Sequence, residues 1–382
     1  MRRATSYSAR RRCAAAALAA TALLLAPVLA RLHAQDEVRA LWVVRTSLVS
    51  PAAIATMVDA ARAGGFNALL VQIRGRGDAY YANALEPRAP SLAGQPAFDP
   101  LAATIARAHV AGLKVHAWIN VNLVAAVNEL PSARDHVVYR HPEWLMVPRA
   151  LAEDLIAVDP RSPQYLGRLA RHVRSQPTEL EGLYLSPIAD ASVDYTAGVV
   201  RDIVSRYAID GVHFDYARYP NDEFDYSRDA LAAFRRSVMP DVPAADARRY
   251  DARLAAEPLT YTAAFPEGWR AFRVARMTAL MARLRETVRA VKPETTVSVA
   301  VFPCSTYLPE NEPVALGAFT TCFGISCLAF NDAETLYVAV EPAVPSPATT
   351  SAPAASPAVT LPILSSMCPP EMRRAPSAPD HT

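Results

Sequence analysis

Residues 207–220 read Tyr-Ala-Ile-Asp-Gly-Val-His-Phe-Asp-Tyr-Ala-Arg-Tyr-Pro, and no other stretch of the chain indicates the fold so clearly. An Asp-Gly pair leads into a predicted strand over residues 211–216, in which Val and Phe alternate with His213 and Asp215. Strands of a parallel sheet are covered on both faces, and charged side chains are rarely buried without a partner. An acid at the end of this strand, followed by Arg218 and two tyrosines, therefore predicts an enclosed site.

Short apolar runs alternate with amphipathic helical stretches on both sides of this segment. Strands are predicted at residues 38–44, 66–73, 113–124, 211–216 and 295–302, and helices at 51–63, 100–111, 192–207, 228–238 and 268–292. Ser50 and Asp99 are expected to cap the first two helices, each of which begins with proline. Residues 125–163 form a long irregular connection of the kind that is often functional. The alternation predicts a parallel sheet covered by helices.

Two α/β architectures fit this alternation, a doubly wound sheet and a closed (β/α)8 barrel. The first strand is not followed by Gly-x-Gly-x-x-Gly, which disfavours the dinucleotide-binding version of the wound sheet. Polar residues instead follow the ends of several strands, where a barrel places its active site. They are Arg45, Arg74 with Asp78, Asn120 with Asn122, and Asp215 with Arg218. The fold class is therefore predicted as α/β, a TIM (β/α)8-type barrel.

The first 34 residues read as a secretory signal, with a basic start, an apolar core over residues 13–30 and a plausible cleavage site before Gln35. The alternative is an uncleaved anchor helix, for which the apolar core is short. We expect an exported protein, periplasmic or extracellular, with no stable membrane span after cleavage. All five cysteines lie outside residues 14–303, so the predicted catalytic body depends on no disulfide and has no cysteine-based metal site.

The charge and the motifs also narrow the function. The formal net charge is +2, from 39 basic and 37 acidic residues, which gives no indication of a nucleic-acid partner. The sequence contains no His-Glu-x-x-His, no Gly-x-Ser-x-Gly and no phosphate-binding loop. We therefore expect neither a metal nor a cofactor.

The regular alternation ends near residue 303. Only a degraded sixth strand near residues 322–330 follows, so the predicted domain, residues 35–341, is an incomplete barrel after its fifth or sixth strand. Residues 342–382 are rich in Pro, Ala and Ser, and we expect a disordered tail. The loss of pattern is interpreted as a truncation or frameshift, with a genuine linker as the alternative.

Two further segments supply candidate site residues, each with a structural alternative. The loop after residue 73 carries Arg74, Asp78, Tyr81 and Glu86, which suit sugar binding; Asp78 would otherwise cap a turn, and Glu86 would be an exposed loop acid. The strand before residue 124 carries His116, Trp118 and Asn120 in one phase. Its histidine is as readily a core residue and its tryptophan a core or platform residue. For Asp215 the alternative is an ion pair with Arg218 that only holds the loop.

With these segments in place, the chain resembles the glycosyl-hydrolase-like family ten, a set of exported bacterial barrels. The resemblance covers residues 37–303 and rests on four motifs in order: Arg-Ala-Leu-Trp at 39–42; Arg74 with Asp78-Ala-x-Tyr81 and Glu86-Pro; His116-Ala-Trp118-Ile-Asn120; and Asp-Gly-Val-His213-Phe-Asp215-Tyr216-x-Arg218-Tyr219-Pro. It implies a TIM-like barrel that cleaves glycosidic bonds, in at least one member those of peptide-free peptidoglycan strands. The chain departs from the family pattern after the fifth strand, where Cys327-Leu-Ala-Phe stands for a Cys-Pro-Met-x-Tyr-like segment.

The predicted function is hydrolysis of O-glycosidic bonds in a polysaccharide or cell-wall glycan. This reaction uses two carboxyl groups, and Asp215 is expected to act as nucleophile or base. Glu86 and Asp78 are the candidates for the partner acid, with Asp222 and Glu223 as further ones. Substrate contacts are predicted at Arg74, Tyr81, His116, Trp118, Asn120, His213, Tyr216, Arg218 and Tyr219. Two alternatives stay open, a glycan-binding or inactive barrel and an exported structural protein without a sugar site.

Overall fold

The computed structural model describes residues 38–301 and 335–339. The predicted signal segment (1–34), the degraded strand near residues 322–330 and the predicted tail (342–382) lie outside the described residues. Within them, no helix is both long and apolar enough to cross a membrane.

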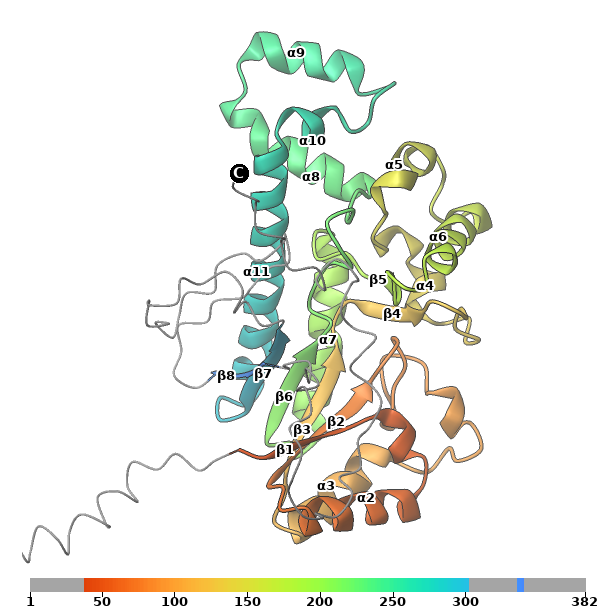
Figure 1. Cartoon of the computed structure of the whole chain (residues 1–382), viewed down its shortest axis with the longest axis vertical. Helices are drawn as coiled ribbons and strands as arrows, with labels where there is room; N and C mark the ends of the chain where they lie inside the picture. The colour runs from red at the N-terminus through yellow and green to blue at the C-terminus, as the bar shows by residue number, and fades with distance from the viewer. Residues whose placement is uncertain (1–37, 302–334, 340–382) are drawn as a thin grey trace, which may run out of the picture.

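One parallel sheet of six strands forms the centre of the described fold (Figure 1). The strands lie in the order β1, β2, β3, β6, β7, β8, and each neighbouring pair is parallel. Their bounds are Ala40–Val43, Ala68–Arg74, Lys114–Asn120, Gly211–Asp215, Thr296–Val301 and Thr335–Ala339. All five predicted strands are therefore present, and β8, at residues 335–339, is a further strand that the sequence analysis did not predict.

The order of the strands distinguishes the two architectures that the sequence allowed. Across the sheet, the strands follow one another in the order in which they occur in the chain. In a doubly wound sheet, by contrast, successive strands are added first on one side of the first strand and then on its other side. The sheet is thus of the TIM-barrel type. In the described part of the chain β1 pairs only with β2, and β8 only with β7, so the barrel is open there.

The two faces of this sheet differ in character. The face toward the helices carries the apolar phase of the strands and belongs to the main hydrophobic core, with Val43, Val71, Val115, Val212 and Val299 among its members. The other face carries aromatic and polar side chains. Across it, Gln72 pairs in register with Trp118, Trp118 with His213, and His213 with Ser298. This second face is the one that a barrel turns toward its interior.

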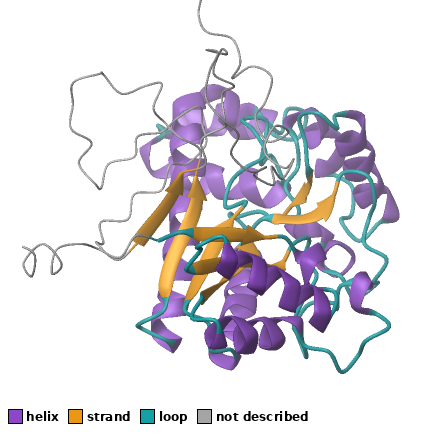
Figure 2. Cartoon of the chain, turned by 60° about the horizontal axis from the view of Figure 1, so that its bottom comes forward, coloured by secondary structure: helices purple, strands orange, loops and turns teal. Residues whose placement is uncertain are grey.

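Helices pack around the sheet (Figure 2). Those that share its main hydrophobic core are α2 (Pro51–Ala63), α3 (Pro100–Val110), α7 (Asp190–Arg206) and α11 (Pro266–Val291). The predicted caps of the first two are confirmed, because the Ser50 and Asp99 side chains accept hydrogen bonds from the amides of Ala53 and Ala102. Helix α2 ends before Gly65, whose φ of +76° suits glycine. Short 3-10 turns follow β1 (η1, Arg45–Leu48) and precede α3 (η2, Pro90–Leu92).

The connection between β3 and α7 is more ordered than the predicted irregular stretch. The predicted strand over residues 113–124 ends at Asn120, and β4 (Leu123–Ala126) pairs antiparallel with β5 (Gly182–Tyr184) in a small second sheet. Between them lie α4 (Val137–Arg140), η3 (Pro142–Trp144), α5 (Arg149–Ile156) and α6 (Pro163–Ser175). Sequence analysis predicted none of α4, η3, α5, α6 and β5. We name residues 121–189 the β3 insertion.

A second group of helices follows β6. It comprises α8 (Arg228–Val238), η4 (Met239–Asp241), α9 (Ala244–Arg253) and α10 (Thr260–Ala264), and it packs on the first half of α11. Its small core is aromatic, with Tyr226, Phe234, Tyr261 and Trp269 buried together. In Figure 1 these helices and the β3 insertion lie beyond the carboxyl ends of β3 and β6, the end at which a barrel binds its substrate.

Candidate active site

Three strands bring predicted site residues to one edge of the sheet. Arg74 ends β2, Asn120 ends β3 and Asp215 ends β6. Asn120 and Asp215 are direct partners in the register of β3 and β6, and an Arg74 Nη1 donates to the Asn120 carbonyl oxygen. The parallel register therefore places all three backbones side by side, as the sequence predicted.

Asp215 is partly buried and accepts hydrogen bonds on both carboxyl oxygens. The indole Nε1–H of Trp118 donates to Oδ2 at 3.1 Å, and the backbone N–H of Tyr216 donates to Oδ1 at 2.7 Å. Burial raises the pKa of Asp215 to about 6, although these two donors and the nearby Arg218 guanidinium lower it. A carboxyl group with a pKa near neutrality can act as nucleophile, base or acid in catalysis.

The backbone at Tyr216 creates one of these two bonds. Its φ is +51°, in the left-handed region that residues other than glycine seldom adopt. This turn directs the Tyr216 amide back at the carboxylate of the preceding residue. Tyr216 is 7% exposed, and its ring contacts the guanidinium groups of Arg218 and Arg76, which lie 5.0 and 5.8 Å from the ring centroid. Unfavourable backbone geometry of this kind is concentrated at functional sites.

The structural alternative for Asp215, an ion pair with Arg218 that only holds the loop, is not present among the described residues. The Arg218 Nη2 donates to both carboxyl oxygens of Glu181, each at 2.9 Å, and the Tyr184 hydroxyl also donates to Glu181. Glu181 directly precedes β5 in the β3 insertion, and its charge raises the pKa of Asp215, whereas Arg218 lowers it. Asp215 thus lies close to a matched positive and negative charge.

Arg74 and Glu86 form a second ion pair, which is fully buried. The guanidinium Nε and Nη2 each donate to one Glu86 oxygen at 2.6 Å, and both side chains have no exposed surface. The Tyr195 hydroxyl donates to Glu86 as well, at 2.9 Å. Glu86 is therefore no exposed loop acid. Three donors hold it while the pair fastens the loop after β2 to β3.

Asp78 has a freer carboxylate on the same loop. It accepts the Arg76 backbone N–H at 2.8 Å, so the predicted turn cap is present, and it forms no ion pair within the described residues. Arg76 also contacts the Tyr216 ring, which places this loop beside the turn that follows Asp215.

The two predicted histidines lie deeper in the sheet than Asp215. His213 is fully buried, with its Nδ1 at 2.8 Å from the Ser298 hydroxyl and its ring edge-on to Trp42 at 4.7 Å. Burial lowers the pKa of His213 to about 3 and also lowers that of His116, so both are neutral near pH 7. His116 packs against Gly211, where a Cβ atom would lie 2.3 Å from its Nδ1.

The remaining candidates are held within the protein. Asn120 donates to the Gly75 carbonyl oxygen at 2.8 Å and contacts the Gln72 amide at 3.4 Å. Tyr81 and Tyr219 are each 1% exposed, the former against Tyr207 and the latter bonded to the backbone of α11. As placed here, neither ring offers a face to a sugar. The site therefore gathers Trp118, Asp215, Tyr216 and Arg218, with Asp78 on the adjoining loop.

Sequence analysis missed Glu181 and Arg76. Glu181 falls in a stretch to which no element was assigned, and the alternating run that follows it, Gly-Leu-Tyr-Leu, was the available signal for a strand. Arg76 lies between the named residues Arg74 and Asp78, and nothing in its spacing indicates a contact with the next loop.

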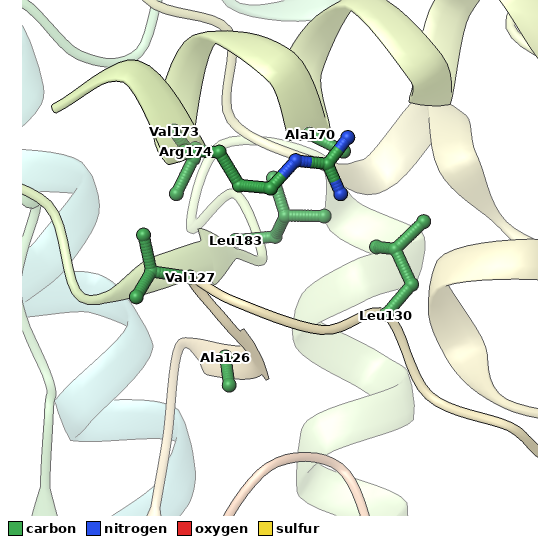
Figure 3. A pocket seen from close by; sticks show the side chains of 7 residues that line it. All are labelled: Ala126, Val127, Leu130, Ala170, Val173, Arg174 and Leu183. Carbon is green, nitrogen blue, oxygen red and sulfur yellow. The ribbon is translucent and has the colours of Figure 1, made fainter. Parts of the chain in front are cut away.

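Other hollows in the described residues lie elsewhere. The niche in Figure 3 is formed by β4, β5 and α6, where the Arg174 side chain extends over Leu183, and it has no room for a water molecule. Its lining contains no carboxylate. The described residues also contain no group of three or more His, Cys, Asp or Glu side chains that would hold a metal ion.

The sequence model of a protein family, glycosyl hydrolase-like 10, matches residues 37–173 and 170–320, well over half of the chain. The chain belongs to this family. The matched region contains the strands that carry Arg74, Asn120 and Asp215, so the family assignment and the geometry concern the same part of the fold.

Curated relatives of this chain are named glycosyl hydrolases, in agreement with the family assignment. The chain is 25% identical over 220 residues to glycosyl hydrolase YngK of Bacillus subtilis (strain 168), which covers 52% of this chain and 37% of that protein. It is 26% identical over 165 residues to glycosyl hydrolase DigH of Escherichia coli (strain K12), covering 40% of this chain and 30% of that protein. The chain thus matches about a third of the length of these curated relatives.

Among solved structures, the glycoside hydrolase domain of PgaB (BpsB) from Bordetella bronchiseptica is similar at 16% identity and a TM-score of 0.43. The likeness covers 69% of this chain and 65% of that domain.

Proposed function

We propose that this protein hydrolyses O-glycosidic bonds in a polysaccharide, with peptide-free peptidoglycan strands as the first candidate substrate. The observation that supports the proposal most directly is Asp215, a carboxyl group at the carboxyl end of a barrel strand with a pKa raised to about 6. Membership of a glycosyl hydrolase-like family supports the reaction class. The substrate is inferred from the family resemblance.

Asp215 suits the role of nucleophile or base. With a pKa of about 6 it is largely ionised at pH 7, and the N–H groups of Trp118 and Tyr216 orient both of its oxygens. A glycosidic bond breaks through an oxocarbenium-like transition state, which carries positive charge on the sugar. A carboxylate held in a partly buried site stabilises that charge more than one in water.

The sequence also offered Asp222 and Glu223 for the second carboxyl group; both are exposed on the loop after β6, and Asp222 pairs with Arg273 at 3.8 Å. The contacts of the other candidates favour Asp78. Glu86 is enclosed and held by Arg74 and Tyr195, and Glu181 is bound through both oxygens by Arg218. Either would have to break an ion pair before donating a proton. Asp78 has no such pair within the described residues, and its loop adjoins Tyr216 through Arg76. We therefore propose Asp78 as the general acid.

Reducing-end release from peptide-free peptidoglycan strands tests the proposal. The chain from Gln35 onward, its Asp215→Asn variant and an Asp251→Asn control on α9 would be compared. We expect release by the parent and the control and none by Asp215→Asn. Binding without release by the folded parent would instead indicate a glycan-binding protein, and release by Asp215→Asn equal to the parent's would remove Asp215 from the mechanism.

The choice of acid has its own test. A general acid matters most when the leaving group is poor, so Asp78→Asn should lose activity on glycan strands and retain more of it on an aryl glycoside with a good leaving group. Glu86→Gln should show no such difference between the two substrates. Equal losses of Asp78→Asn on both substrates would contradict the assignment.

We also propose that the protein is exported to the periplasm or the exterior, on the basis of residues 1–34. Fusion of this segment to a reporter enzyme that is active only outside the cytoplasm tests it. Reporter activity is expected, and its loss when the apolar core is interrupted by charges is the control.

A further inference from the structure

A cavity of about 170 Å³ lies between the β3 insertion and α8, apart from the residues that surround Asp215. Helices α5, α6 and α8 form its walls, and the backbone bond from the Tyr226 amide to the Val147 carbonyl oxygen, at 2.8 Å, joins the two sides. Its lining combines Leu155, Ile156, Tyr165 and Tyr226 with the charged residues Glu143, Arg228 and Asp229. Because the β3 insertion and the loop after β6 supply them, the cavity lies at the same end of the sheet as Asp215.

Tyr165 is the most informative of these residues. The residue is only 4% exposed and lines the cavity. Its hydroxyl makes no hydrogen bond with any described residue, and its oxygen is not among the fully enclosed polar atoms that lack a partner, so it is open to the cavity. A hydroxyl that is open to a cavity and has no partner in the protein is available to a ligand or to water. Burial raises the pKa of Tyr165, so the hydroxyl is protonated at neutral pH and can both donate and accept.

The rest of the lining combines apolar surface with hydrogen-bond acceptors. Leu155, Ile156 and the Tyr226 ring supply the apolar part. The Asp229 carboxylate and the Glu143 carboxylate, one of whose oxygens also contacts His141 at 3.1 Å, supply acceptors. The Arg228 guanidinium is already engaged, because it donates to the carbonyl oxygens of Ile156 and Val158. A ligand with several hydroxyl donors and one apolar face matches this set.

Other ligand classes fit less well. The two carboxylates repel an anion, and the one guanidinium that would attract it is bound to backbone carbonyls. No cluster of metal-binding side chains is present in the described residues. The volume equals that of roughly five or six water molecules, enough for a single small ring and below the range of extended ligands.

We propose that this cavity binds one pyranose unit of a glycan, as a second carbohydrate site separate from Asp215. The Tyr165 hydroxyl and the Asp229 and Glu143 carboxylates receive the sugar hydroxyl groups, and Tyr226 and Leu155 contact its apolar face. The choice of a sugar as ligand rests on the proposed function.

Binding of glucose and N-acetylglucosamine to the full chain tests this site by saturation-transfer NMR and calorimetric titration. The Asp215→Asn variant serves as the parent protein, which prevents turnover. Adding Tyr165→Phe removes one oxygen atom and should weaken binding of at least one sugar about five- to tenfold, the value of one good hydrogen bond. Asp229→Ala, at an exposed position, should weaken it several-fold. Tyr250→Phe, on α9, is the matched control and should leave affinity unchanged.

The outcomes distinguish this site from the proposed hydrolysis. Affinities that are equal in the parent, Tyr165→Phe and Asp229→Ala would overturn the site, and so would the lack of binding of either sugar. Tyr165-dependent binding in a protein that hydrolyses no glycan would retain the site and reject the enzymatic proposal. Hydrolysis without Tyr165-dependent binding would reject the site and leave the enzymatic proposal intact.

Discussion

Replacing Asp215 by asparagine removes the charge at the end of β6 with little change in shape. The substitution therefore measures how much the buried carboxylate lowers the free energy of unfolding. Burial raises the pKa of this group to about 6, despite the opposing donors Trp118 and Tyr216. A raised carboxyl pKa means that the folded protein binds the proton more tightly than the unfolded chain. The contribution of this group to stability is therefore complete below its ordinary pKa near 3.8 and is lost as the pH rises through about 6.

The magnitude follows from the same values. A pKa of about 6 in place of 3.8 corresponds to about 3 kcal/mol of unfolding free energy above neutral pH, as an order-of-magnitude figure. About 1 kcal/mol of this is already lost at a pH of about 4.5. Asparagine does not titrate, so the stability of Asp215→Asn relative to the parent should rise by about 2 kcal/mol between pH values of about 4.5 and 8.

A second effect of the substitution cancels in this comparison. Both Asp215 oxygens accept N–H groups, whereas the asparagine amide turns its NH2 toward one of those donors. This mismatch costs about 1–3 kcal/mol. The cost is the same at every pH, so only the difference between the two pH values is diagnostic.

Urea unfolding of parent and variant at the two pH values is the assay. Asp251→Asn is the control with the opposite sign, because hydrogen bonds from Arg235 and Tyr261 lower the pKa of Asp251. Its removal should cost stability at high pH and less at low pH. A difference between Asp215→Asn and the parent that is equal at both pH values, within about 0.5 kcal/mol, would refute the reasoning.

Further predictions concern activity and packing. The value of kcat/KM should rise with pH through about 6 if Asp215 acts as a carboxylate, and a fall over that range would assign it the acid role. Glu181→Gln frees the neighbouring guanidinium for Asp215, so kcat should fall and the rise in the pH profile should shift to lower pH. An unchanged profile would contradict this. Glu86→Gln leaves a buried guanidinium without its charge partner and should lower stability in thermal unfolding by about 3–5 kcal/mol; a loss below about 1 kcal/mol would contradict a buried pair. Gly211→Ala places a Cβ atom against His116 and should cost about 1–3 kcal/mol, of which His116→Ala in the same chain should recover part.

The fold was predictable where its signals are local. Helices α2 and α8 have the predicted bounds, because a cap residue and an apolar period lie within the same few residues. The end of β6 was predictable for the same reason, since a period of two over residues 211–215 places Asp215 on the face opposite the helices. Parallel register then brings Asn120 beside it without further information.

The β3 insertion was less predictable because its order depends on tertiary contacts. Strand β5 has only three residues and exists by pairing with β4, about 60 residues earlier in the chain. The ion-pair partner of each charged side chain was equally unpredictable from the sequence. Arg218 lies three residues from Asp215 but pairs with Glu181, 37 residues away, and Glu86 is enclosed by Arg74 and Tyr195. A sequence shows which charges exist, and only the packed chain shows how they are matched.

The pairing of Arg218 with Glu181 affects the charge that Asp215 presents in the proposed mechanism. If Arg218 were bound to Asp215, it would cancel the negative charge that an oxocarbenium-like transition state needs beside it. Glu181 binds the guanidinium through both oxygens instead, so the pair contributes little net charge and Asp215 keeps its own. The donors that do contact Asp215, an indole and a backbone amide, are neutral and orient the carboxylate without cancelling its charge. Burial then amplifies the field of that charge, and the same burial raises its pKa toward the working pH. In the proposed mechanism, the stability lost in holding the carboxylate and the stabilisation that it would offer to a positively charged sugar thus have one physical origin.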